Sequence, residues 1–175
     1  MKKLIAIVFW ASAASRVLAQ LNEEKVHEFL NAFMEKDSAV FQLQGRASFG
    51  FFGKYLPGIF GDTIFTENDS IFMNRQFLLS EKQHWKNGEF DKAHIITEHV
   101  FRRTFRHGDG WNKFHKKFAD CLRSWSLPIF NQEYTYCVFY HWIQCDYLAG
   151  GGTLDLYRWI NGKWVFEKSY AMGMS

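Results

Sequence analysis

The sequence has little proline, no low-complexity segment and no apolar run long enough to cross a membrane. The only two prolines, Pro57 and Pro128, and the lack of repeats argue against linkers, disorder and a second domain. A transmembrane helix needs about 20 apolar residues, and the run at residues 4–14 is about half that length. We therefore expect no membrane anchor.

The N-terminus has the pattern of a cleavable export signal. Lys2 and Lys3 precede the apolar run, and the run leads to small residues that end at Ala19. The sequence thus predicts a signal peptide over residues 1–19 and a secreted, extracellular protein with one domain over residues 20–175.

Removal of the signal would leave the protein without net charge. The sequence has 21 basic and 18 acidic residues, and residues 1–19 hold three bases and no acid. The remaining 18 of each sign give no support for a nucleic-acid partner. One local cluster of bases remains between residues 102 and 117, where Asp109 is the only acid. It indicates either a patch for an acidic partner or glycan, or a solvated basic rim.

Cysteine is also scarce, with only three residues. An exported protein can form one disulfide from them and keep one thiol. If residues 134–147 form a strand, Cys137 and Cys145 lie about 26 Å apart, so a disulfide would join Cys121 to Cys137 or to Cys145. Three buried thiols are the alternative.

The first half of the domain has mainly helical patterns. Asn22 can cap a helix whose apolar stripe runs from Val26 to Met34, and a short second helix is expected from Asp37 or Ser38. Residues 45–61 have no clear pattern. Short strands are expected at 63–66 and 70–73, followed by a helix over 75–86. The turn between these strands contains Asn68 in an Asn-Asp-Ser sequon, which predicts glycosylation on a surface loop.

Strand patterns dominate the second half. A long strand is expected over 94–106, residues 111–125 fit either helix or strand, and a further strand is expected over 134–147. Gly150–Gly152 would be a loop before a hairpin of residues 153–160 and 163–170. The Asn161-Gly162 turn fixes its register, with Trp159 opposite Trp164, Tyr157 opposite Phe166 and Asp155 opposite Lys168.

The order of these elements resembles the nuclear-transport-factor-2-like superfamily. The resemblance covers about residues 21–172 and is carried by Ser70–Met73 and by residues 154–166; it departs from the family at residues 111–125. The chain is also similar to secreted nematode members whose roles are mostly unassigned. The resemblance implies an α+β fold in which N-terminal helices pack on a strongly curved, mostly antiparallel sheet, the cystatin-like cone, around a pocket.

No sequence motif indicates a particular reaction. His99 and His141 have apolar neighbours in the predicted strands, so either imidazole could serve as a general base in a pocket; core histidines are the alternative. The histidines and cysteines have no metal-ligand spacing and no nucleophile motif, so we expect no metal and no cofactor.

We therefore expect a non-catalytic binding domain. It would bind a small apolar ligand in an aromatic pocket, or a protein partner such as a second copy on its sheet face. A small lyase or isomerase is the alternative. The expected ligand-binding residues are Phe101, Tyr157, Trp159, Phe166 and Tyr170.

Overall fold

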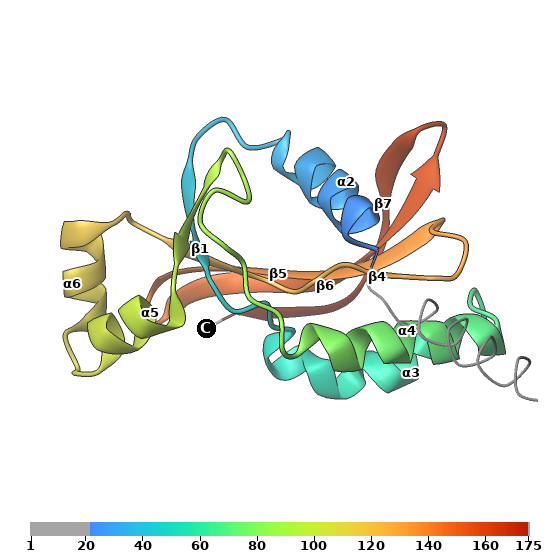
Figure 1. The fold of residues 1–175 in the computed structure, drawn as a ribbon. Coiled ribbons are helices and arrows are strands. Elements are labelled where there is room, and N and C mark those ends of the chain that lie inside the picture. Colours follow the sequence, from blue (N-terminus) through green and yellow to red (C-terminus); the bar gives the residue numbers. More distant parts are fainter. Residues whose placement is uncertain (1–21, 175) are drawn as a thin grey trace, which may run out of the picture.

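The computed structural model describes residues 22–174, and the predicted signal peptide lies outside them. The described chain is an α+β fold, as expected, with five α-helices and an open, mixed sheet of seven strands. The strands of the main path follow the order β2-β1-β3-β5-β6-β7, and β4 pairs separately with β5. Helix α2 covers one face of this sheet, α3 and α4 lie against the other, and α5 and α6 stand at one end (Figure 1).

The first predicted helix is confirmed as α2, Glu23–Met34. The Asn22 side chain accepts a hydrogen bond from the backbone N–H of Lys25 and so caps the helix. Phe29, at 1 % exposure, is the centre of its buried face. The Phe29 ring lies 5.1 Å from that of Phe139 and 5.2 Å from that of Tyr157, centroid to centroid, so aromatic contacts join α2 to the sheet.

The expected short helix after Asp37 is wrong, because the chain enters the sheet there. Strand β1, Phe41–Gln44, alternates buried and half-buried residues and pairs in parallel with both β2, Ala93–Ile96, and β3, Leu122–Trp125. The alternation has a period of two, which a helix does not satisfy. Arg123 on β3 pairs with Asp37 through two hydrogen bonds and so fixes the start of β1.

Helices replace the two short strands expected at 63–66 and 70–73. The 3₁₀ helix η1, Gly50–Tyr55, leads into α3, Leu56–Phe60, and then into α4, Glu67–Ser80. Thr66 and Asp69 form a capping box, in which each side chain accepts a hydrogen bond from the other residue's backbone N–H. Asn68 is therefore exposed in the first turn of a helix, and the predicted loop is wrong. The helix ends at Ser80, so half of the expected helix at 75–86 lies within α4 and the other half forms a loop.

The long strand expected over 94–106 is also wrong. It stops at Ile96, and Thr97 caps α5, Glu98–Phe105, by accepting a hydrogen bond from the backbone N–H of Val100. The ambiguous segment 111–125 contains both structures, since α6, Gly110–Lys117, precedes β3. The apolar faces of α5 and α6 pack on each other; the rings of Phe105 and Trp111 lie 5.0 Å apart.

The C-terminal strands follow the prediction closely. After β4, Ile129–Phe130, the chain forms β5, Tyr136–Asp146, β6, Ala149–Ile160, and β7, Lys163–Met174. The predicted loop at 150–152 is wrong, because β6 runs through it and the turn is at residues 147–148. A Cβ at Gly152 would lie 2.1 Å from the His141 carbonyl oxygen, so the close approach of β5 requires glycine there.

The hairpin register agrees with the prediction near its turn and departs from it farther away. Asn161 and Gly162 have φ values of 49° and 80°, which fit the predicted turn. The expected aromatic pairs are present. Register shifts near residues 154–157 place Asp155 opposite Ser169, so its predicted pairing with Lys168 is wrong.

A disulfide joins Cys121 to Cys145, one of the two expected pairings. The third cysteine, Cys137, is a free, fully buried thiol whose pKa is raised by burial. Over residues 22–174 no helix has the length and apolar character of a membrane span.

Candidate functional site

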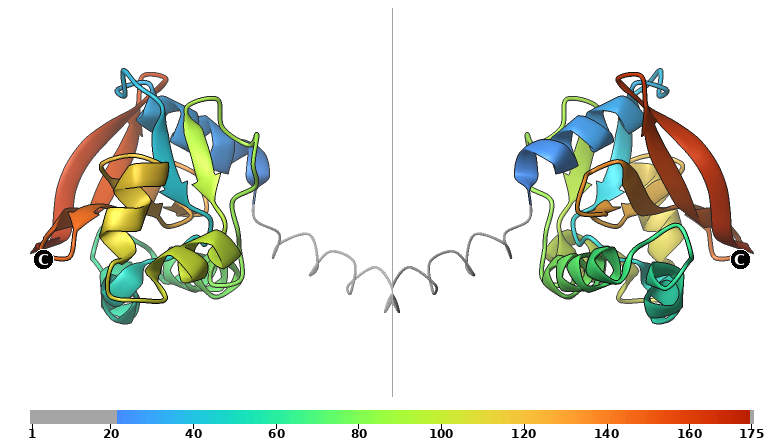
Figure 2. Two further views of the ribbon diagram at one scale, coloured as in Figure 1. Left: turned by 90° about the vertical axis from the view of Figure 1, so that its left-hand side faces the viewer. Right: turned by 90° about the vertical axis from the view of Figure 1, so that its right-hand side faces the viewer.

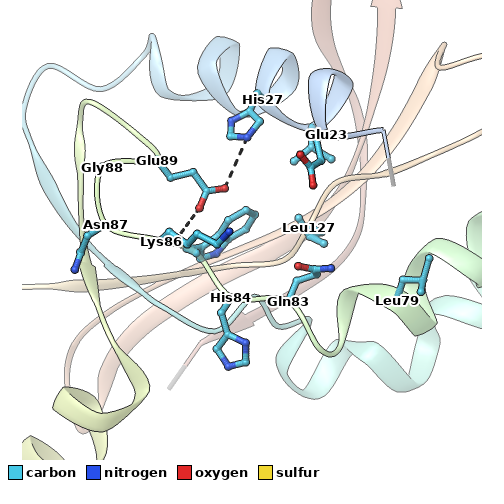
Figure 3. A pocket seen from close by; sticks show the side chains of 12 residues that line it. Glu23, His27, Leu79, Gln83, His84, Lys86, Asn87, Gly88, Glu89 and Leu127 are labelled. Carbon is cyan, nitrogen blue, oxygen red and sulfur yellow. Dashed lines mark hydrogen bonds and ion pairs between the residues drawn. The ribbon is translucent and has the colours of Figure 1, made fainter. Parts of the chain in front are cut away.

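The larger of two described cavities has a volume of about 610 Å³ and lies between the start of α2 and the loop that follows α4 (Figure 3). Residues 83–89 of this loop supply seven of its twelve lining residues. The loop is held in place because residues 45–47 lie alongside residues 83–85: the backbone N–H of Trp85 donates to the Gly45 carbonyl over 2.7 Å. The volume is in the range of small-molecule sites.

The apolar part of the lining comes from three buried residues. Val26 of α2, Trp85 of the loop and Leu127, which follows β3, are each at most 6 % exposed and belong to one hydrophobic cluster. The Trp85 indole N–H is buried and has no hydrogen-bond partner. A buried donor of this kind is rare in folded proteins, because burial without a partner costs about 1–3 kcal/mol. This unpartnered donor is covered by the protein and is not exposed in the cavity that Trp85 lines.

Ionisable side chains gather around this apolar surface. In Figure 3 the Glu89 carboxylate points toward His27, whose Nε2 lies 3.8 Å from Glu89 Oε1. The other oxygen of Glu89 accepts a hydrogen bond from the Lys86 backbone N–H over 2.7 Å, which fixes the carboxylate. Glu23, from the first turn of α2, and His84 also line the cavity. The cavity therefore has an apolar surface beside groups of both signs.

A second group of polar side chains lies on the α2-facing side of the sheet. His141 Nε2 is 3.1 Å from Asp155 Oδ2, and the Thr153 hydroxyl donates to the same oxygen over 2.7 Å. Ser169 donates to Oδ1 over 2.7 Å. Burial raises the pKa of Asp155, but the hydrogen bonds from His141, Ser169 and Thr153 outweigh it and hold the pKa below its usual value. Asp155 is therefore a buried carboxylate that orients the His141 imidazole.

His141 lies among aromatic rings and does not line a cavity. Its ring lies 5.2 Å from that of Phe33 and 6.0 Å from that of Phe139, and its side chain is 26 % exposed. Neither described cavity is lined by His141 or His99. His99 is exposed on α5, so its expected place on a strand face is wrong.

The aromatic residues expected to bind a ligand do not come together. Tyr157 is buried beneath α2, whereas Phe101 packs in the cluster of α5 and α6. Trp159 lies against Trp164, and Phe166 is half-exposed on β7. Tyr170 is on the opposite face of the sheet, where its hydroxyl donates to Asp62. None of the five lines either cavity.

The residues that do line the larger cavity had only a weak sequence signal. The Asn87-Gly88 turn, where Gly88 has a φ of 80°, marks the loop, but nothing in the sequence places it beside α2. The remaining cavity, about 410 Å³, lies between η1 and α4 and includes Lys54 and Glu81. Within the described range no group of three histidine, cysteine or carboxylate side chains is arranged to hold a metal ion.

The comparisons with known proteins give no match: no protein-family model, no curated protein and no solved structure matches this chain.

Proposed function

We propose that the protein is a secreted, non-catalytic binding domain that holds a small ligand with an apolar body in the larger cavity. The observation that carries the proposal is the combination of the 610 Å³ volume with the apolar lining residues Val26, Trp85 and Leu127. A ligand with an apolar body would cover Val26 and Leu127 within a cavity of this size. The export signal at residues 1–19 and the cone architecture of the nuclear-transport-factor-2-like superfamily are parts of the same proposal.

Two neighbouring leucines of α4 provide a matched test. Leu79 lines the cavity, whereas Leu78 does not, and both are more than one-third exposed. We expect Leu79→Trp to fill the cavity and to weaken binding of the fluorescent probe 1-anilinonaphthalene-8-sulfonate by about tenfold or more. Leu78→Trp should leave the affinity unchanged. Titration by fluorescence measures both, and equal binding by the two variants would rule out this cavity as the site.

A second copy on the sheet face is the other form of binding that we propose. Val165 and Phe166 of the edge strand β7 are 43 % and 51 % exposed, and they lie on opposite faces of the strand. Sedimentation of the secreted protein distinguishes this form, since pairing would double the mass and the ligand site alone would not.

The hydrogen-bonded pair of His141 and Asp155 favours a second candidate function, that of a small lyase or isomerase with His141 as general base. A carboxylate that orients an imidazole is a common arrangement for proton abstraction. This candidate function predicts that the protein opens the ring of 5-nitrobenzisoxazole, a reaction that needs only a base, and that His141→Ala abolishes this activity. His99→Ala is the control, because His99 is exposed on α5. Equal rates in both variants would eliminate this function.

A further inference from the structure

We propose that the end of the molecule formed by α5, α6 and the β5–β6 turn docks on an anionic lipid surface. This end faces the viewer in the left view of Figure 2, where the two helices lie in front of the sheet. The proposal is independent of the cavity, which lies elsewhere between α2 and the loop of residues 83–89.

The first observation is that the solvent faces of α5 and α6 are basic. Arg102, Arg103 and Arg106 fall within two turns of one face of α5 and its C-terminal cap, and all three are exposed. Lys113, Lys116 and Lys117, which lie within four residues of one another on one face of α6, are also exposed. The opposite faces of the helices pack on each other through Phe105, Trp111 and Phe114. The helical hairpin of α5 and α6 therefore presents a basic surface to solvent.

The second observation is that most of this charge is not neutralised within the protein. Residues 98–120 contain six bases and three acids, a net charge of +3. Glu98 pairs with Arg102 and Asp109 with Lys113, each over 2.7 Å. Among residues 22–174, no acidic side chain pairs with the four remaining bases, Arg103, Arg106, Lys116 and Lys117.

The third observation is an exposed apolar tip beside these bases. Leu148 is 86 % exposed and Tyr147 is 53 % exposed in the two-residue turn between β5 and β6. The Tyr147 hydroxyl donates to the carbonyl of Gly108, in the connection between α5 and α6, over 2.5 Å. The apolar tip is thus fixed next to the basic helices α5 and α6.

Two further links hold α6 to the end of β5. His115 Nε2 lies 2.8 Å from the carbonyl oxygen of Cys145, and the disulfide joins Cys145 to Cys121, which follows α6. The apolar tip and the basic helices therefore form one pre-organised surface, and binding would not have to order it first.

The combination of basic side chains with the apolar tip indicates which kind of polyanion this surface binds. A sulfated glycan or a nucleic acid would use the bases but would gain nothing from the side chain of Leu148. An anionic bilayer uses both, because lipid headgroups attract the bases while the interface accepts an inserted leucine. The exposed Leu148 therefore favours a lipid surface.

Flotation with lipid vesicles tests the proposal on the secreted protein. We expect binding to phosphatidylcholine vesicles that contain about 30 % phosphatidylserine and little binding to phosphatidylcholine alone. Leu148→Asp should weaken binding by about tenfold, and the double variant Arg103→Glu with Arg106→Glu should abolish it. Leu78→Asp is the control, since Leu78 is an exposed leucine on α4, outside this surface; its binding should equal that of the wild type.

Three outcomes would overturn the proposal. They are the absence of binding to both vesicles, equal binding to both, and binding that depends on the arginines but not on Leu148. In the last case, retention of Leu148→Asp on immobilised heparin at the wild-type salt concentration would assign the surface to a soluble polyanion instead. Circular dichroism of each variant separates lost binding from lost folding.

Discussion

At the scale of single residues, Asp155 is an acidic side chain buried on β6. It is 4 % exposed, and its carboxylate accepts hydrogen bonds from the side chains of Thr153 and Ser169 and lies within hydrogen-bond distance of His141. An ionised carboxylate tolerates such burial only when its oxygens are bonded in this way. One of the hydroxyl donors, Thr153, lies on the same strand, and the other, Ser169, lies on β7. The bulge that brings Ser169 opposite Asp155 is therefore part of the site.

Asp155→Asn tests this environment through the pH dependence of stability. Because the pKa of Asp155 is lower in the folded protein than in the unfolded chain, its ionised form stabilises the fold at neutral pH. This stabilisation is lost as the pH falls below about 4 and through the folded pKa. We expect the variant to be less stable at pH 7 by about 1–3 kcal/mol and the difference to shrink toward pH 2–3. Urea unfolding measures it.

The control for this experiment is Asp91→Asn, which removes an exposed acid. Its stability should follow that of the wild type at both pH values. A deficit of Asp155→Asn that stayed the same at acid and neutral pH would mean that the carboxylate's charge contributes nothing to the fold.

At the scale of elements, α4 shows why the sequence was misleading. Its buried positions, Asp69, Met73, Gln76 and Ser80, have helical spacing, but three of the four are polar. The hydrophobic pattern that reveals most helices is therefore absent. The Gln76 side chain can be buried because both of its polar atoms are hydrogen-bonded: it donates to the Phe130 carbonyl and accepts from the Phe130 N–H. This interaction joins distant parts of the chain.

Removal of the capping box measures its contribution to α4. Thr66→Ala deletes the hydroxyl that accepts from the Asp69 N–H, and we expect a loss of about 1 kcal/mol in the free energy of unfolding. Thr66→Ser keeps the acceptor and should retain most of that stability. Thermal or urea unfolding distinguishes the two variants, and an equal loss in both would assign the effect to the methyl group instead.

Helix α5 was missed for a different reason. Phe101 and Phe105 fit a strand face as well as a helix face, because a separation of four residues satisfies both periods. Contact with α6 favours the helix, and that contact is tertiary. The C-terminal hairpin was predictable because the Asn161-Gly162 turn is local, whereas the register shifts near Asp155 depend on packing across the sheet.

At the scale of the whole molecule, the sequence contains 19 Phe and seven Trp, and in the described part of the chain the aromatic side chains mainly fill the core and, apart from Trp85, do not line the larger cavity. The space between α2 and the sheet is filled by side chains such as Phe29, Trp125 and Phe139, each at most 1 % exposed. The larger cavity lies instead where α2, the loop of residues 83–89 and Leu127 meet. These segments come together because β1 inserts between β2 and β3, a parallel arrangement that no short-range pattern encodes.

The charge of the molecule is unevenly distributed along the chain. The chain without residues 1–19 has equal numbers of acids and bases, so the net charge of +3 on residues 98–120 is balanced by an excess of acids elsewhere. The sequence already shows this cluster of bases, and the packing of α5 against α6 brings it to one end of the molecule.

The buried thiol of Cys137 has a practical consequence for work with this protein. The disulfide occupies the other two cysteines, so an alkylating reagent finds one thiol per chain, and that thiol has no exposed surface while the core is intact. The thiolate is the reactive form, and burial disfavours it. The fraction of molecules alkylated under non-reducing conditions therefore counts those whose core has opened, without any engineered label.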